Sequence, residues 1–309
     1  MKYALAALVM FIFPCFVWGS LRDSPSKFHL KGKPMVVVVP SYNNMGWFQA
    51  NIDSIISQDY PNYRIIYIDD CSNDGMSEAL TQYLKEKKVS CQLIDFDENV
   101  YADHLAKSKA FSQKINSGHH FFFTLVRNVK RCGAFENLFR AIYSCRNEEI
   151  VVTVDGDDWL LHVDVLQKLN SIYSTKDVWL THGNLQEFPS GNVGWCQPVP
   201  EEIILANKFR EFRCPSHLRT FYAWLFKKIR IEDLLWKDKF FSMTWDMAMM
   251  FPMVEMCAER HAFVKDVNYG YNMANQINDN KVNAKLQRRL DKHIRHMPRY
   301  KRLAQLPLD

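Results

Sequence analysis

Uninterrupted apolar runs alternate with amphipathic segments along much of the chain. The runs are rich in β-branched side chains, which is typical of strands that are buried on both faces. We expect strands at residues 34–39, 63–68, 91–96, 149–154 and 178–181. The segments between them place apolar residues at helical spacing, and we expect helices at residues 47–58, 76–88, 133–144 and 163–173. This alternation predicts an α/β fold with a mostly parallel central sheet flanked by helices.

Two stretches do not follow this alternation. Residues 97–120 are polar and only partly helical in pattern, and they precede a further apolar run at residues 121–126. Residues 188–233 contain several prolines and no clear periodicity, so we expect an irregular region there. A helical pattern returns at residues 246–259, around Pro252.

The first residues of the chain have the pattern of a targeting segment. Lys2 is followed by an uncharged apolar run at residues 3–18 and by two small residues. This pattern predicts a signal peptide at residues 1–20, followed by a polar linker at residues 21–33. The run is shorter than the roughly 20 residues of a spanning helix, which favours a removed signal over an uncleaved signal anchor, the alternative.

Composition and charge narrow the class of protein. The chain has 309 residues, of which 48% are hydrophobic, and can bury one substantial core. The net charge is +5, and much of the basic excess falls in a tail at residues 281–309, which we expect to be helical. Such a tail is either a solvated helix face or a contact with an anionic membrane surface. No basic stripe interleaved with aromatic residues recurs elsewhere, which argues against nucleic-acid binding.

The cysteines do not form a recognisable metal or disulfide framework. There are eight, and no two are spaced as CxxC, so a zinc site is not expected. Cys15 lies in the predicted signal, and the remaining seven are an odd number. At least one thiol is therefore expected to stay free or to pair between chains.

Polar residues follow three of the expected strands, at residues 40–43, 69–70 and 155–158. In a parallel sheet these strand ends converge on the edge where ligands bind. The last group, Asp-Gly-Asp-Asp, places three carboxylates in one tight turn, which is unfavourable unless a cation lies among them. Hard oxygen ligands favour Mg²⁺ or Mn²⁺. The alternative for the acidic residues at both 69–70 and 155–158 is that they cap the helices that follow.

The chain lacks the usual glycine-rich phosphate loops. No Gly-x-Gly-x-x-Gly follows the first expected strand, and no Walker-type Gly-Lys-Ser/Thr is present. The phosphates of a bound nucleotide would then be held by a metal ion and by basic side chains.

Taken together and in order, these motifs resemble glycosyltransferase family 2, a family of inverting enzymes with the GT-A fold. The resemblance extends over about residues 35–272 and depends on three segments, residues 39–43, 68–75 and 154–158. It implies a GT-A-type single domain with an irregular acceptor region toward the carboxyl end. We expect this domain at residues 34–280, with a nucleotide-sugar half at 34–160 and an acceptor half at 161–280.

The resemblance assigns roles to individual residues. Pro40, Tyr42 and either Asp69 or Asp70 would contact the nucleoside, and Arg131 would be a basic nucleotide contact. Asp155 would reach the ribose or the metal ion, and Asp157 would be the main metal ligand. The segment at residues 267–272 resembles the strand that closes the site in this family.

Inversion needs a base that takes the proton of the acceptor hydroxyl, and the resemblance implies Asp246 for this role. In the family an acidic residue precedes this aspartate, whereas here the position is Trp245. Alternatively, Asp246 caps a helix that begins at Met247. Five further residues are candidates for contacts with the acceptor or the phosphates: Asp158, Trp159, Trp245, and His217 with Arg219 on a flexible loop.

The function implied by this resemblance is metal-dependent, inverting transfer of a sugar from a nucleotide-sugar, most simply a UDP-sugar, to a hydroxyl of a glycan, lipid or protein. The processive Gln-x-x-Arg-Trp motif is absent, so a single transfer is expected. One alternative is a secreted carbohydrate-binding or inactive transferase-like module, with Trp159, Trp195 and Trp245 stacking on sugars. Another is a nucleotidyltransferase of similar fold, although its glycine-rich basic loop is missing.

The predicted signal places the protein in the endoplasmic reticulum or Golgi lumen, or outside the cell. The absence of an Asn-x-Ser/Thr sequon disfavours long lumenal residence. A membrane-tethered cytosolic form is the alternative.

Overall fold

The computed structural model of the chain describes residues 32–97, 103–117, 121–276 and 283–304. These residues belong to one compact unit that begins at Lys31. The predicted signal at residues 1–20 and nearly all of the linker lie outside the described residues. Within the described ranges, no helix combines the length and the apolar character needed to cross a membrane.

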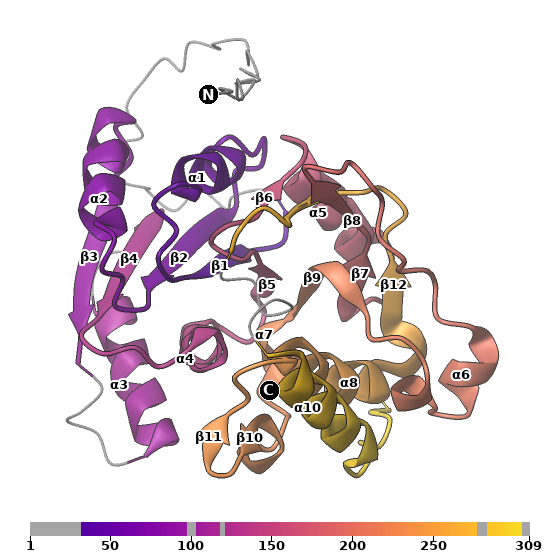
Figure 1. Ribbon diagram of the computed structural model, residues 1–309. Helices are drawn as coiled ribbons and strands as arrows, with labels where there is room; N and C mark the ends of the chain where they lie inside the picture. Colours follow the sequence, from indigo (N-terminus) through magenta and orange to yellow (C-terminus); the bar gives the residue numbers. More distant parts are fainter. Residues whose placement is uncertain (1–31, 98–102, 118–120, 277–282, 305–309) are drawn as a thin grey trace, which may run out of the picture. The chain divides into compact units, whose positions relative to one another are not determined.

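A mixed sheet of eight strands runs through the described part of the chain (Figure 1). Its order is β12-β7-β9-β5-β1-β2-β4-β3. The strands are β1 Met35–Ser41, β2 Tyr63–Asp69, β3 Cys91–Phe96, β4 Phe123–Asn128, β5 Ile150–Thr153, β7 Leu180–Gly183, β9 Ser216–Tyr222 and β12 His261–Phe263. Neighbours pair in parallel except at β9, which is antiparallel to both β5 and β7. The predicted α/β fold with a mostly parallel sheet is confirmed.

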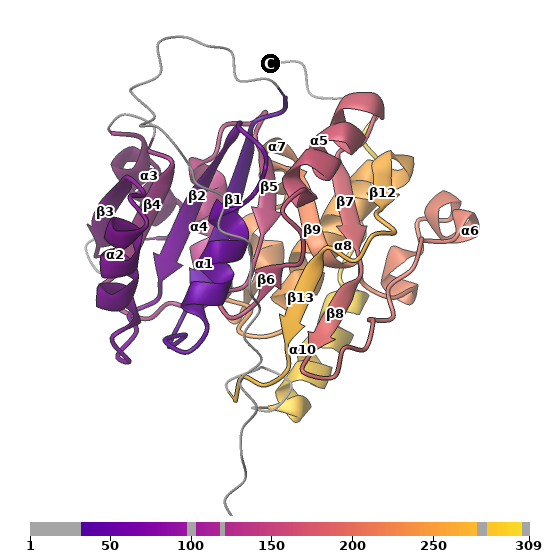
Figure 2. The same cartoon turned by 90° about the horizontal axis from the view of Figure 1, so that it is seen from above.

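Helices cover both faces of this sheet, as the view in Figure 2 shows. One face packs on α1 Phe48–Ile56, α2 Met76–Glu86 and α5 Val165–Thr175. The other packs on α3 His104–Asn116, α4 Ala134–Ser144 and α8 Trp245–Cys257. Side chains of β1 alternate between the two cores, with Val36 and Val38 in one and Val37 and Val39 in the other. This period of two explains why residues 35–39 of β1 are all apolar.

The remaining elements are short and lie mostly in the second half of the chain. They are α6 Glu201–Leu205, η2 Phe209–Glu211, α7 Ala223–Phe226, η3 Ile231–Leu234, η4 Ala258–Arg260, and the strand pair β10 Leu235–Trp236 and β11 Lys239–Phe240. A second sheet has the order β6-β13-β8, from β6 Trp159–Leu160, β13 Tyr269–Asn272 and β8 Leu185–Phe188. Strand β13 corresponds to the closing strand expected at residues 267–272.

The expectation of an irregular region at residues 188–233 is wrong at one important place. Strand β9 lies inside this region and forms part of the main sheet, between β5 and β7. This strand contains the polar residues His217, Arg219 and Thr220. Thr220 hydrogen-bonds Tyr173 and Thr181 in the core, while His217 and Arg219 belong to the site described below. A buried strand with polar side chains resembles a loop in sequence.

The basic tail also differs from a freely solvated helix. Helix α10, Ala284–His296, buries Leu290 and Ile294 against the core that contains α8. Its basic residues lie on the remaining surface and at its end. This helix is therefore part of the folded domain.

Candidate functional site

The acidic turn after β5 is held tightly against the end of β1 and against α1. A Cβ atom at Gly156 would lie 2.5 Å from Ser41 Oγ, so only glycine fits at this position. The Asn51 side chain of α1 donates hydrogen bonds to the carbonyls of Asp155 (2.9 Å) and Asp158 (2.7 Å). The three aspartates are thus presented by a turn of fixed shape.

The three carboxylates of this turn have different surroundings. Asp158 is 1% exposed and accepts hydrogen bonds from Tyr269 Oη and the Asn272 backbone N–H, both at 2.7 Å. Burial raises the pKa of Asp158, and the nearby Asp157 and Asp155 raise it further. Asp157 accepts a hydrogen bond from Asn275 Nδ2 at 2.7 Å. Strand β13 and the residues after it therefore fasten this turn.

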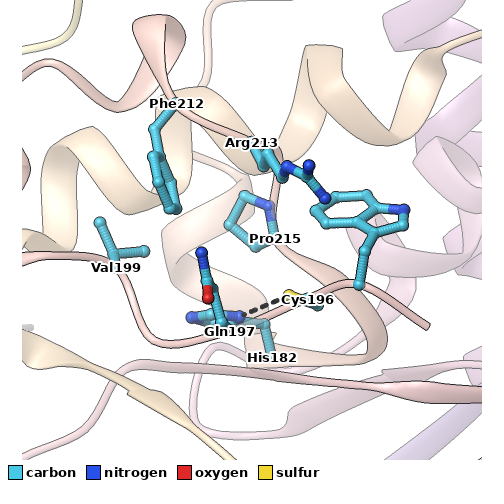
Figure 3. A pocket seen from close by; sticks show the side chains of 8 residues that line it. His182, Cys196, Gln197, Val199, Phe212, Arg213 and Pro215 are labelled. Atoms are coloured by element: carbon cyan, nitrogen blue, oxygen red, sulfur yellow. Dashed lines mark hydrogen bonds between the residues drawn. The ribbon is translucent and has the colours of Figure 1, made fainter. Parts of the chain in front are cut away.

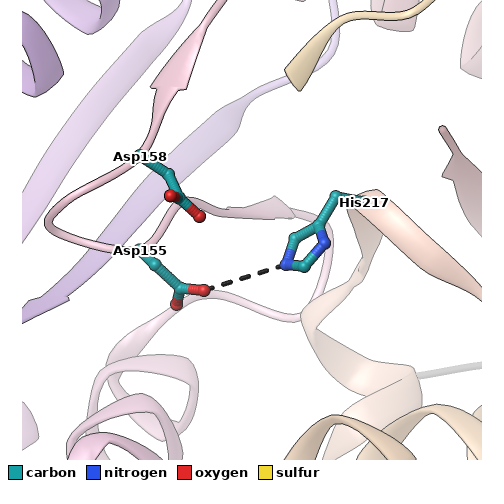
Figure 4. A group of neighbouring side chains, drawn as sticks. All are labelled: Asp155, Asp158 and His217. Carbon is teal, nitrogen blue, oxygen red and sulfur yellow. Dashed lines mark ion pairs between the residues drawn. The ribbon is translucent and has the colours of Figure 1, made fainter. Parts of the chain in front are cut away.

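One aspartate pair and a histidine form a possible metal-binding group. Ligand atoms of Asp155, Asp158 and His217 all lie within 4.8 Å of one another (Figure 4). Burial and the neighbouring Arg219 lower the pKa of His217, which favours the neutral imidazole that a metal needs. The buried Nδ1 of His217 has no hydrogen-bond partner among the described residues. Carboxylates suit Mn²⁺ or Mg²⁺, and an imidazole suits a transition metal, so this group could hold a divalent cation. Asp157 is not a member of this group, and its predicted role as main ligand stays a prediction.

His217 and Arg219 do not lie on a flexible loop, as the sequence suggested, but on strand β9. They are two residues apart on this strand, and both side chains are buried. Arg219 Nη1 donates to His217 Nε2 at 2.8 Å, and Arg219 Nη2 donates to Asp246 Oδ2 at 3.2 Å. His217 Nε2 is 3.8 Å from Asp155 Oδ2. Strand β9 thus links the acidic turn to Asp246.

Asp246 lies in the first turn of α8, with 32% of its side chain exposed. The helix begins at Trp245, and its N-cap is Thr244, which has a left-handed φ of 53° and makes no side-chain capping bond. Asp246 is therefore not the cap of a helix beginning at Met247. Trp245 stacks on Phe135 at 5.9 Å and contributes to the core beside the site.

A cavity of about 710 Å³ unites several of the predicted residues. Its lining includes Asp155, His217, Arg219, Trp245 and Asp246. Its size is within the roughly 300–1,000 Å³ typical of small-molecule sites. Asp158 and Trp159 are not among the lining residues of this cavity. Trp159 instead packs over Gly270 of β13, where its indole leaves no room for a Cβ atom.

The residues predicted to contact the nucleoside form a separate group at the ends of β1, β2 and β4. The guanidinium of Arg131 lies 3.7 Å from the centre of the Tyr42 ring, and its Nε is 3.9 Å from Asp70 Oδ2. Pro40 accepts a hydrogen bond from the Gly156 N–H, which connects this group to the acidic turn.

The carboxylates of Asp69 and Asp70 are buried and already engaged. Asp70 accepts hydrogen bonds from the backbone N–H groups of Cys132 and Gly133 and from Asn128 Nδ2. Asp69 accepts from the Ser72 N–H, and burial raises its pKa. Asp70 thus fastens the loop that carries Arg131, a structural task that the sequence did not indicate.

Sequence reasoning missed the residues that hold the acidic turn and those that complete the cavity wall. The first group is Asn51, Tyr269, Asn272 and Asn275. The second is the set of α10 residues Gln287, Arg288 and Asp291. Only the resemblance of residues 267–272 to a closing strand pointed toward the first group. No local pattern pointed to α10.

Comparison with known proteins gives a match within the first half of the domain. Residues 36–113 match the family model described as glycosyl transferase family 2. A putative teichuronic acid biosynthesis glycosyltransferase, TuaG, of Bacillus subtilis (strain 168) is 41% identical over 83 residues, which are 26% of this chain and 32% of that protein. An uncharacterized glycosyltransferase of Rickettsia bellii (strain RML369-C) is 29% identical over 70 residues, 23% of this chain and 10% of that protein. This chain thus spans a third or less of the length of these relatives.

The fold is similar to that of solved structures over a longer stretch. The complex of S. aureus TarS 1-349 with UDP has a TM-score of 0.52 at 15% identity and covers 78% of this chain and 60% of that chain. The complex of the same protein with UDP-GlcNAc has a TM-score of 0.50 at 14% identity, over 78% of this chain and 59% of that chain. At this identity the likeness concerns the fold alone. Residues 36–113 are therefore similar to glycosyl transferase family 2, and the α/β fold is similar to that of TarS.

Proposed function

We propose that this protein transfers a sugar from a nucleotide-sugar, with UDP as the nucleotide, to an acceptor hydroxyl with inversion at the anomeric carbon. The observation that carries the proposal is the cavity in which Asp155, His217, Arg219 and Asp246 meet. It combines a possible metal group, a fixed cation and a partly exposed carboxylate. These are the parts that such a transfer needs.

The donor diphosphate would lie beside the acidic turn. Asp155, Asp158 and His217 would hold Mn²⁺, with Asp157 as the predicted further ligand, and Mg²⁺ is the alternative ion. When bound, the ion would neutralise charge on the diphosphate leaving group. Arg219 is fixed on β9 within the cavity and supplies a second positive charge. The bond from the sugar to the diphosphate would therefore break next to this pair of charges.

Asp246 would act as the general base. Its hydrogen bond with Arg219 fixes the direction of the carboxylate, and the other oxygen, which has no hydrogen bond to a described residue, would accept the proton of the acceptor hydroxyl. Inversion requires attack from the side opposite the leaving group. The donor would bind beside Asp155, and Asp246 lines the same cavity, so the base would be close to the reacting sugar.

The nucleoside would bind near Tyr42 and Arg131. The similar fold of TarS in complex with UDP supports UDP as the first nucleotide to test.

For the location of the protein, we propose the secretory pathway or export, with a membrane-tethered cytosolic form as the alternative, on the basis of residues 1–20 alone.

UDP binding should depend on a divalent metal ion. A diphosphate beside three carboxylates is repelled unless a cation lies between them, so EDTA should weaken UDP binding at least about tenfold relative to Mn²⁺. Calorimetry measures the affinity directly. His217→Ala should also reduce the difference between Mn²⁺ and EDTA, whereas the exposed control His162→Ala should not. Equal UDP affinity in Mn²⁺ and EDTA would count against the metal assignment.

Arg131→Ala should weaken UDP binding roughly tenfold, the usual scale of a lost charge-assisted contact. The side chain is 61% exposed and its ion pair with Asp70 is long, so the thermal midpoint should hardly change. Lys130→Ala removes the neighbouring exposed cation and serves as the matched control. An unchanged UDP affinity in Arg131→Ala, measured by calorimetry, would remove this residue from the nucleotide site.

A further inference from the structure

The cavity extends beyond the predicted catalytic residues to a wall that belongs to neither the acidic turn nor α8. This wall includes Trp195, which follows β8, and Gln287, Arg288 and Asp291 on α10. The two segments are about ninety residues apart in sequence and come together only in the fold. The wall combines one aromatic ring with charged and amide side chains, whereas a site for a lipid chain would be lined by apolar side chains.

Trp195 is an unusually exposed aromatic residue. Its surface is 52% exposed to solvent, although burial of an indole is normally favourable. The guanidinium of Arg213 lies over the ring, 5.0 Å from its centre. Figure 3 shows Arg213 at a small neighbouring pocket that Trp195 also lines. Arg213 thus packs against the indole, and Trp195 also lines the large cavity.

Helix α10 presents its polar residues to the same cavity from a fixed position. Arg295 Nη1 donates to the carbonyls of Arg210 (2.6 Å) and Phe212 (2.7 Å), and Leu290 is buried in the core. Asp291 accepts a hydrogen bond from Arg295 Nε at 2.8 Å. Arg288 is exposed and makes no ion pair with any described residue. A guanidinium offers five N–H donors to a ligand.

We propose that this wall is an acceptor subsite for a carbohydrate, with a sugar ring on the accessible face of Trp195 and its hydroxyls bound by Arg288 and Asp291 of α10. The inference rests on the proposed sugar transfer and names the acceptor class. A sugar offers both an apolar ring face and many hydroxyls that donate and accept, which matches an indole beside a guanidinium and a carboxylate. A lipid chain would instead cover charged groups without pairing them, which is unfavourable.

The test uses the full chain with UDP and Mn²⁺ on a printed array of neutral and acidic glycans. The affinity for the best-bound glycan is then measured in solution for the wild type and its variants. Trp195→Ala should weaken glycan binding roughly tenfold, whereas Trp195→Phe should retain most of it because a flat ring remains. Arg288→Ala should weaken binding severalfold. UDP affinity should stay unchanged in all three variants.

A matched control is Phe188→Ala. Phe188 is 41% exposed, belongs to the neighbouring strand β8 and does not line the cavity, so its removal should leave glycan affinity unchanged. Equal glycan affinity in Trp195→Ala and wild type would overturn the inference. So would a wild-type chain that binds UDP but no glycan, or that binds phosphatidylglycerol vesicles instead. Glycan binding through Trp195 without any UDP binding would support the saccharide subsite and contradict the proposed transfer.

Discussion

Asp246→Asn should reduce sugar transfer by roughly 10²- to 10⁴-fold, the usual contribution of a general base. Asparagine keeps the size of the side chain and one oxygen that can accept the hydrogen bond from Arg219. It cannot take up the proton of the acceptor hydroxyl. UDP affinity should therefore stay near the wild-type value while turnover falls. Release of UDP from UDP-sugars, with a glycan acceptor or with water, measures the loss.

The control for this substitution is Glu259→Gln, which neutralises an exposed carboxylate just beyond the other end of α8. It should leave both transfer and UDP affinity unchanged. If Asp246 has only a structural role in the first helical turn, Asp246→Asn should cost about 0.3–1 kcal/mol of stability and little activity. Near-wild-type turnover in Asp246→Asn would therefore rule out the base assignment.

Glu255→Gln should destabilise the fold by about 3–5 kcal/mol, because it leaves a buried guanidinium without its counter-charge. Both oxygens of Glu255 accept from Arg210, at 2.6 and 2.9 Å, and one also accepts from the Tyr300 N–H. Arg210 in turn donates to the carbonyls of Ile294 and Met297 at the end of α10. The pair thus joins α8, which carries Asp246, to α10. Urea denaturation measures the change in the free energy of unfolding.

Two comparisons make this prediction specific. Arg302 and Glu259 form an exposed pair, and Glu259→Gln should cost less than about 1 kcal/mol. Replacing both buried partners, as in Arg210→Met with Glu255→Leu, should restore much of the loss because no unpaired charge remains. A cost below about 1 kcal/mol for Glu255→Gln would show that the pair does not hold the two helices together. Its burial and full engagement also make Glu255 unsuitable as an alternative general base.

The local sequence predicted most elements of the first half of the chain closely, except residues 97–120, where the pattern was only partly helical and the structure has α3. The valines of β1 face both sides of the sheet, and helices cover both sides, so every valine of this run is buried. Strand ends were equally clear, since polar residues begin where β2 and β5 leave the core. The convergence of these ends then followed from the parallel topology alone.

Tertiary structure decided the roles of the acidic residues. A strand-end aspartate can reach solvent or turn inward, and local pattern does not distinguish these cases. Asp70 and Asp158 turn inward because partners distant in sequence, Cys132 with Gly133 and Tyr269 with Asn272, satisfy their oxygens. Asp246 remains partly exposed and faces Arg219, a partner on another element.

Strand β9 and helix α10 show why the other half of the site could not be predicted from the sequence. Periodicity reveals burial only where buried side chains are apolar, and the buried side chains of β9 include His217, Arg219 and Thr220. In α10, the sequence shows an amphipathic basic helix but not which surface its apolar face covers. Packing of Leu290 and Ile294 into the core beside α8 brings Arg288 and Asp291 to the cavity. The sequence thus determined most of the parallel strands of the sheet and its acidic edge, whereas long-range packing decided which side chains share one cavity with Asp246.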